Sequence, residues 1–148
     1  MTSVACVDDN RLLGEALGSR LGREPGFVWL GCLHRAEGAL ERLVELAPDL
    51  VLLDLDMPGL DSFALLEHAG GSLPSTRIVV ITASTRASDR DHALARGAWG
   101  YLSKGISTLR LLEAMRRVMA DEVVLDEVGA VDDGTFPPGP SSGAAQPG

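Results

Sequence analysis

The chain alternates short apolar runs with longer segments in which apolar residues recur every three or four positions. The short runs have strand length, and the longer segments have the spacing of amphipathic helices. The run at 50–53 contains no polar residue, as expected for a strand buried on both faces of a parallel sheet. The expected strands are 3–7, 27–33, 50–53, 77–81 and 98–102, and the expected helices are 11–23, 36–47, a short one from about 62, 85–96 and 107–119.

Turn and capping residues support these boundaries. Pro25-Gly26 and Pro48 end the first two helices, while Asp61 and Ser107 are suitable N-caps for the third and fifth. The helix at 85–96 has few large apolar residues, so we expect it to be loosely held. Strands that alternate with helices predict an α/β fold, with a doubly wound five-stranded parallel sheet between two helical layers.

Length and charge indicate one domain followed by a tail. The 148 residues carry a net charge of −8, and six of the 21 acids lie in residues 121–148, which contain no Lys or Arg. We therefore expect a domain at 1–120 and an acidic, then Pro/Gly/Ser-rich tail at 121–148, disordered from about 132. The nearly balanced domain argues against direct nucleic-acid binding. No run has membrane-spanning length and no signal peptide is recognisable, so a soluble, cytoplasmic protein is expected.

The two cysteines, Cys6 and Cys32, lie inside apolar strand-like runs. Two buried thiols at this spacing are typical of small reduced side chains in a core. They do not suggest a disulfide framework or a metal site.

Polar residues stand at the ends of four of the expected strands: Asp8-Asp9, Asp54, Thr82 and Lys104. In a doubly wound sheet the carboxyl ends of the strands share one edge, where such folds place their ligands. Carboxylates gathered there repel one another unless a cation joins them, and an all-oxygen set suits Mg²⁺. A hydroxyl and an ammonium opposite the acids can receive the oxygens of a phosphoryl group.

Lys104 is the only lysine among 13 basic residues. A lysine ammonium is a compact point charge on a flexible stem, whereas arginine presents a planar fork. One lysine retained after the fifth expected strand therefore indicates a specific role at this edge.

In residues 3–119 the sequence resembles the receiver domains of two-component response regulators. Each part of the resemblance is weak alone, but the parts occur in order and at the right strand ends. They are Asp8-Asp9, Asp54, Met57-Pro58, Asp61, Thr82-Ala83, Tyr101 and Lys104. The family fold is flavodoxin-like, with strand order 2-1-3-4-5.

The resemblance implies that Asp54 accepts a phosphoryl group from a histidine kinase. Mg²⁺ would be bound by the carboxylates of Asp9 and Asp54 and the backbone carbonyl of Asp56, with Asp8 acting largely through water. Such a domain catalyses its own phosphoryl transfer and slow autodephosphorylation and is not otherwise an enzyme.

The resemblance also implies a switch. Lys104 would bind the phosphoryl group, Thr82 would supply the switch hydroxyl, and Tyr101 would be the aromatic residue that changes rotamer. The altered surface would be read by an unknown downstream protein or by a second copy of the chain. Trp99 has the same strand parity as Tyr101, so both are expected on one face of the sheet.

The sequence departs from the family pattern at three positions. Ser62 stands where the family usually has Gly, and Asp56 adds an acidic side chain beside the expected phosphoryl position. Gly105 follows Lys104 in place of the common Pro, which resembles the LuxR-type subfamily. Residues 121–126 resemble the start of that subfamily's linker, but no sequence resembling its DNA-binding domain follows.

One alternative uses the same residue types. Small phosphohydrolases of the haloacid-dehalogenase type also carry an Asp-x-Asp after a strand, a later Ser or Thr, and a Lys, and here Asp54, Asp56, Thr82 and Lys104 imitate that set. In that family the nucleophile strand comes first and the second acidic pair later. The early Asp8-Asp9 pair and the lack of room for a cap domain favour the receiver.

Overall fold

The computed structural model describes residues 1–83 and 86–125. Their elements, in chain order, are β1 (Thr2–Val7), α1 (Arg11–Leu21), β2 (Phe27–Leu33), α2 (Ala39–Leu46), β3 (Leu50–Asp54), α3 (Ser62–Ser72), β4 (Arg77–Thr82), α4 (Ala87–Ala95), β5 (Gly100–Ser103), α5 (Thr108–Met119) and β6 (Val124–Leu125). The predicted tail from 126 onward lies outside the described residues. None of the helices in the described part has the length and apolar character needed to cross a membrane.

The sheet has the strand order β2-β1-β3-β4-β5-β6, and every pair in it is parallel. The predicted order 2-1-3-4-5 is therefore confirmed. The short β6 was not predicted as a strand; it pairs Val124 with Gly100 and buries the Val124 side chain. Because Gly100 has no side chain, Val124 can approach β5 closely: a Cβ added at Gly100 would lie 3.2 Å from the Val124 carbonyl oxygen.

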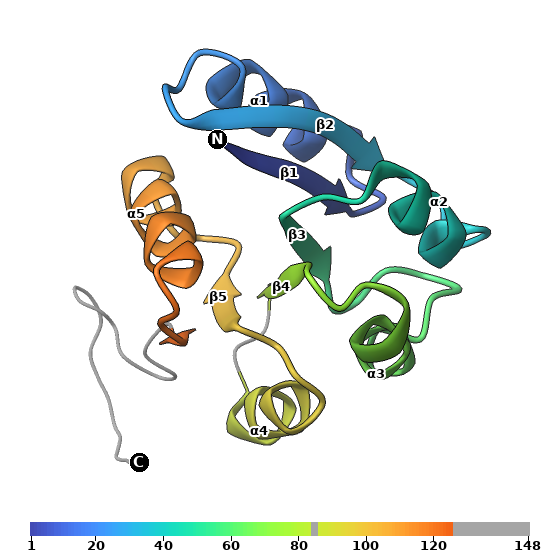
Figure 1. The fold of residues 1–148 in the computed structure, drawn as a ribbon. Helices are drawn as coiled ribbons and strands as arrows, with labels where there is room; N and C mark the ends of the chain where they lie inside the picture. The colour runs from blue at the N-terminus through green and yellow to red at the C-terminus, as the bar shows by residue number, and fades with distance from the viewer. Residues whose placement is uncertain (84–85, 126–148) are drawn as a thin grey trace.

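Strand alternation divides the core between the two faces of the sheet. On β3, Leu50 and Leu52 pack with α1 and α5, and Val51 and Leu53 pack with α2, α3 and α4. Figure 1 shows the resulting layers, with α5 on one side of the sheet and α2 and α3 on the other. The two clusters explain why the 50–53 run contains only apolar residues, since both of its faces are covered.

Side-chain caps set several helix starts as expected. Asp61 accepts a hydrogen bond from the Ala64 amide (3.0 Å), and Ser107 accepts one from the Arg110 amide (3.2 Å). The second helix starts later than predicted, at Ala39 and not at 36, because Gly38 precedes it in the left-handed region (φ 71°).

A bulge in β2 changes which side chains reach which face. The pairing of β1 with β2 shifts between Val4 and Ala5, and Gly31 takes a φ of 122° there. As a result Trp29 and Cys32, three positions apart, both pack on the α1/α5 face. Without the extra residue, simple alternation would place them on opposite faces.

The expectation that Trp99 and Tyr101 share a face is wrong. Tyr101 is buried among α2, α3 and α4 residues, whereas Trp99 packs against the α1/α5 cluster. Trp99 precedes the first residue of β5, so strand alternation does not fix its side chain. Its ring lies under the Arg77 guanidinium, whose carbon is 4.3 Å from the ring centroid.

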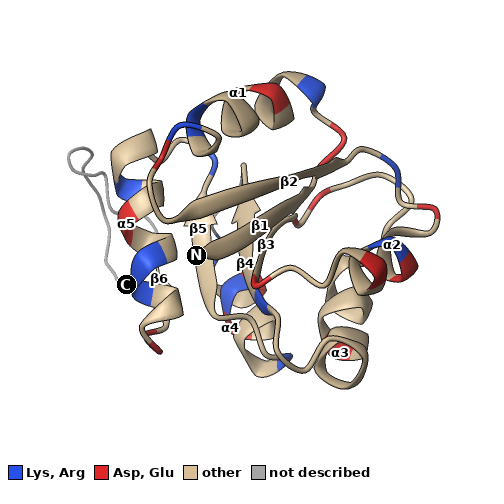
Figure 2. Ribbon diagram, turned by 45° about the horizontal axis from the view of Figure 1, so that its top comes forward, with Lys and Arg blue, Asp and Glu red and all other residues tan. Residues whose placement is uncertain are grey.

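Charged residues of both signs are spread over the helices. In Figure 2, α2 and α5 each carry acidic and basic positions. This agrees with the nearly balanced charge expected for the domain.

Candidate functional site

The polar residues that follow the strands converge at the carboxyl edge of the sheet. Asp8 follows β1, Asp54 ends β3, Thr82 ends β4, and Lys104 lies just after β5. These four strands are neighbours in the sheet, so the chain positions that sequence analysis singled out meet at one place.

Three carboxylates form the centre of the site. Asp8, Asp9 and Asp54 each offer an oxygen, and these oxygens lie within 4.8 Å of one another. Asp8 and Asp54 are buried, while Asp9 is exposed. Two buried acids beside a third exposed one form a cluster that opens toward solvent on the Asp9 side.

Lys104 partly neutralises this cluster. Its Nζ lies 2.9 Å from Asp8 Oδ2 and 3.4 Å from Asp54 Oδ1. Burial alone would lower the pKa of Lys104, but its contacts with Asp8 and Asp54 outweigh burial and raise that pKa. The ammonium therefore stays protonated between the two buried acids.

The surroundings of Asp54 oppose the ionisation of its carboxyl. Burial raises the pKa of its carboxyl above the ordinary value, and the charge of Asp8 adds to the rise. The hydrogen bond from the Asp56 amide to Asp54 Oδ1 (3.1 Å) and the Lys104 ammonium act in the opposite direction. One ammonium among three carboxylates leaves the cluster with a net negative charge that a further cation would offset.

Ser62 anchors the strand end that carries Asp54. Its buried hydroxyl donates a hydrogen bond to the Asp54 carbonyl oxygen (2.9 Å). The sequence indicated only that the loop at Ser62 departs from the family's Gly. The bond ties the first turn of α3 to the end of β3, and a residue without a hydroxyl would leave that buried carbonyl without this donor.

Thr82 is fully buried, and its hydroxyl donates to Asp56 Oδ2 (3.1 Å). Sequence analysis placed the Asp56 carbonyl on the metal and its acidic side chain beside the phosphoryl position, but did not foresee this contact with Thr82. The exposed Asp56 side chain thus holds the Thr82 hydroxyl at the end of β4. This contact depends on the path of the turn after β3.

Tyr101 lies on the α2–α4 side of the sheet and is fully buried, with 0% exposure. Burial, followed by the negative charges of Asp89 and Asp56, raises the pKa of its hydroxyl. The ring therefore occupies the inward position in this structure.

Asp8 is held through both its carboxylate and its backbone carbonyl. The Asn10 amide donates to Asp8 Oδ1 (2.9 Å). Cys32 Sγ on β2 and Nδ1 of His34, just after β2, lie 3.7 Å and 2.9 Å from the Asp8 carbonyl oxygen. These contacts were not foreseen, because they depend on the register between β1 and β2.

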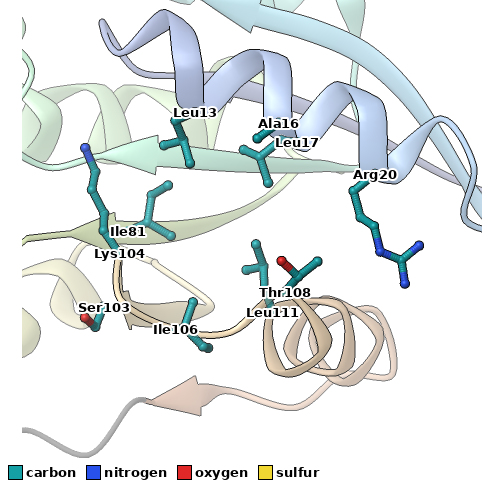
Figure 3. A pocket seen from close by; sticks show the side chains of 10 residues that line it. All are labelled: Leu13, Ala16, Leu17, Arg20, Ile81, Ser103, Lys104, Ile106, Thr108 and Leu111. Atoms are coloured by element: carbon teal, nitrogen blue, oxygen red, sulfur yellow. The ribbon is translucent and has the colours of Figure 1, made fainter.

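An apolar cavity of about 120 Å³ borders the site on the α1/α5 side. Figure 3 shows the Lys104 stem beside it, with the ammonium directed away from the apolar side chains. The cavity is lined by Leu13, Ala16, Leu17, Arg20, Ile81, Ser103, Lys104, Ile106, Thr108 and Leu111.

The donor set fits a hard divalent cation. The three clustered ligand atoms are carboxylate oxygens, one of the carboxylates is open to solvent, and Mg²⁺ prefers such oxygens together with water. Asp8 Oδ2 is buried and accepts no well-formed hydrogen bond from the described residues, although Lys104 is its close ion-pair partner. The site thus has acceptor capacity directed toward a cation.

Comparison with known proteins agrees with this geometry. The family model of the response regulator receiver domain matches residues 4–116. The chain belongs to the response regulator receiver family. It is 34% identical over 125 residues to the nitrate/nitrite response regulator protein NarL of Escherichia coli (strain K12), covering 84% of this chain and 58% of that protein. It is 30% identical over 122 residues to the response regulator GacA of Pseudomonas aeruginosa, covering 82% and 57%.

Solved receiver structures have the same fold. The signal receiver domain of the putative response regulator NarL from Mycobacterium tuberculosis matches with a TM-score of 0.74 and 26% identity, over 80% of this chain and 96% of that one. A LuxR family response regulator from Aurantimonas matches with a TM-score of 0.77 and 24% identity, over 84% and 89%. The LuxR-type likeness predicted from Gly105 is confirmed. This receiver chain spans somewhat over half the length of the curated relatives described above.

The haloacid-dehalogenase alternative gains no support. The receiver family model covers both the early acidic pair and the later Asp54 strand, in the order that the receiver pattern requires. Asp8 follows β1 and Asp54 ends the adjacent strand β3, so the two acidic positions form one cluster.

Proposed function

We propose that Asp54 is the phosphoacceptor of this receiver, and that phosphorylation by a histidine kinase changes a protein-interaction surface on the α4–β5 side. The observation that carries the proposal is the arrangement around Asp54. A buried carboxylate with a raised pKa lies beside two further acids, with one ammonium close enough to reach a group attached to it.

The chemistry is an in-line transfer. An Asp54 carboxylate oxygen attacks the phosphorus of a donor phosphohistidine, a P–O bond forms, and the P–N bond breaks. The departing imidazole keeps the bonding electron pair and takes a proton. Lys104, now paired with Asp8 and Asp54, would bind an oxygen of the transferred group and offset its charge.

Asp8, Asp9 and Asp54, with the backbone carbonyl of Asp56, would hold Mg²⁺. When bound, the ion would offset negative charge on the transferring group and draw it toward Asp54. The buried Asp8 carboxylate suits a ligand held through one oxygen or through water, and the exposed Asp9 leaves room for solvent ligands.

The switch would start at Thr82. Its hydroxyl now donates to Asp56, so binding a phosphoryl oxygen requires that hydrogen bond to break. The move would change the space beside Tyr101 and the packing of α4, which lie on the same face. Such a change is driven by the difference in phosphoryl contacts between the two states. The partner that binds the altered surface would be a downstream protein or a second copy of the chain.

The proposal is tested by incubating the chain with Mg²⁺ and a small acyl phosphate and then measuring intact mass. We expect one phosphoryl adduct in the wild type and none in Asp54→Asn or in excess EDTA. Asp61→Asn is the matched control, because asparagine caps α3 as well as aspartate does and the residue lies outside the acid cluster. An adduct that persists in Asp54→Asn would exclude Asp54 as the acceptor.

A further inference from the structure

Two cysteines face each other across β1 and β2, beside the site but outside the proposed chemistry. Cys6 and Cys32 are direct partners in the parallel register, and both thiols are free. Neighbouring strands lie about 4.8 Å apart. Disulfides span Cα separations of about 4.4 to 6.8 Å, so the backbone already stands within bonding range.

The bulge in β2 creates this pairing. The register shift at Gly31 brings Cys32 opposite Cys6, and both side chains pack on the α1/α5 face. With uninterrupted pairing, Cys6 would face Gly31 and the two sulfurs would lie on different faces.

The two sulfurs differ in access to solvent. Cys6 is fully buried, whereas Cys32 is partly exposed and lines a cavity of about 390 Å³. The cavity is open enough for a small oxidant, and Arg11, Arg35 and Arg42 surround it. A reagent from solvent therefore reaches the partly exposed Cys32 more readily than the fully buried Cys6.

We propose that Cys6 and Cys32 are a redox modification site, which a hydroperoxide oxidises to a disulfide joining β1 to β2. In the first step the Cys32 sulfur attacks an oxygen of hydrogen peroxide, the O–O bond breaks, and Cys32 sulfenic acid and water form. In the second step the Cys6 sulfur attacks the Cys32 sulfur and the S–O bond breaks. The hydroxyl leaves with the Cys6 proton as a second water, so two thiols are oxidised and one peroxide is reduced.

The bond should be easily reduced. Both side chains leave the sheet in the same direction from adjacent parallel strands, so the sulfurs must turn toward each other against the strand spacing. Disulfides formed under such constraint are the labile, regulatory kind. Oxidation also turns the Cys32 sulfur toward Cys6 and away from the Asp8 carbonyl oxygen, its present hydrogen-bond acceptor.

The test is a peptide map of the folded wild-type chain after hydrogen peroxide treatment and alkylation of the remaining thiols. Trypsin should release residues 1–11 and 24–35 as one linked species, which a dithiol reagent separates. The intact protein should be lighter by two hydrogen atoms. Wild-type protein that gains oxygen on Cys32 without any linkage, or that links only between two chains, would overturn the proposal.

Single variants separate the roles of the two thiols. In Cys6→Ala, Cys32 should gain one or more oxygens because no second thiol can resolve the sulfenic acid. In Cys32→Ala, Cys6 should stay unmodified because it is fully buried. Equal oxidation of Cys6 in Cys32→Ala and of Cys32 in Cys6→Ala would contradict the order of attack. The wild-type map decides the question even if a variant folds poorly.

Discussion

The helices α4 and α5 flank the same strand, β5, yet they are held to the sheet very differently. Helix α5 buries Leu111, Leu112, Ala114, Met115 and Val118, whereas α4 buries Ala93 alone. Helix α5 also begins at a side-chain cap, and α4 has no side-chain cap. The two helices lie on opposite faces of the sheet, with α5 in one core cluster and α4 in the other.

This difference indicates which part of the domain can respond to a change at Asp54. Moving a helix that buries five side chains exposes much apolar surface, whereas moving one that buries a single alanine exposes little. Elements that move in switching come from the less stable parts of a structure. Tyr101 packs in the same core cluster as Ala93 of α4, so the weakly held helix lies beside the aromatic part of the proposed switch.

The largest expected effect is the loss of stability when a side chain that anchors α5 or α4 to the sheet is truncated. Met115→Ala in α5 should destabilise the domain by about 3 kcal/mol, because it removes a fully buried side chain and leaves a cavity. Leu94→Ala in α4, where the leucine is only partly buried, should cost less than about 1 kcal/mol. Urea unfolding followed by circular dichroism measures both. Equal losses would mean that α4 is anchored as firmly as α5.

The next effect concerns the switch. Phosphorylation of Asp54 should change amide hydrogen exchange in α4 and β5 by about tenfold, equivalent to about 1.4 kcal/mol, and leave α5 unchanged. Thr82→Ala should reduce this change while still allowing phosphorylation, because it removes the hydroxyl without touching Asp54. Mass spectrometry of peptides from each helix measures the exchange. Trp99 fluorescence is a poor substitute, since that indole packs on the α1/α5 face.

A change confined to α1 would contradict this prediction. The surface that responds to phosphorylation would then lie on the opposite face of the sheet, where α1 packs with α5.

The smallest effect concerns the charge at the site in the absence of metal. The raised pKa of Asp54 means that ionising it costs more in the folded than in the unfolded chain. That cost is present once the pH exceeds the folded pKa and disappears as the pH falls below the ordinary value of 3.8. Asp54→Asn should therefore raise the metal-free melting temperature at neutral pH by about 3 °C, and the gain should vanish near pH 3.

Mg²⁺ provides the control for this experiment. It should stabilise the wild type by binding the folded state alone, and it should stabilise Asp54→Asn less, since one carboxylate ligand is gone. A wild-type melting temperature that is the same with and without Mg²⁺ would count against the metal site.

Much of the fold was predictable because each strand signal is local. The apolar run at 50–53, the polar residues at strand ends and the caps at Asp61 and Ser107 depend on neighbours in the chain. The meeting of Asp8, Asp54 and Lys104 followed from one general rule, that parallel strands bring their carboxyl ends to one edge. The weak hold on α4 also followed from composition, since the segment has few large apolar residues.

Other features needed the tertiary structure, because they depend on register and on side-chain direction. They are the bulge at Gly31, the pairing of Cys6 with Cys32, and the hydrogen bond from Thr82 to Asp56. Each depends on how neighbouring strands and loops are aligned, which no local sequence pattern sets. The prediction of the Trp99 side-chain direction from strand alternation was wrong, because Trp99 precedes β5 and stacks with Arg77. The sequence by itself determined which residues reach the edge of the sheet. Only the packed structure decided which of them touch, because a shift of one residue between strands reverses the faces.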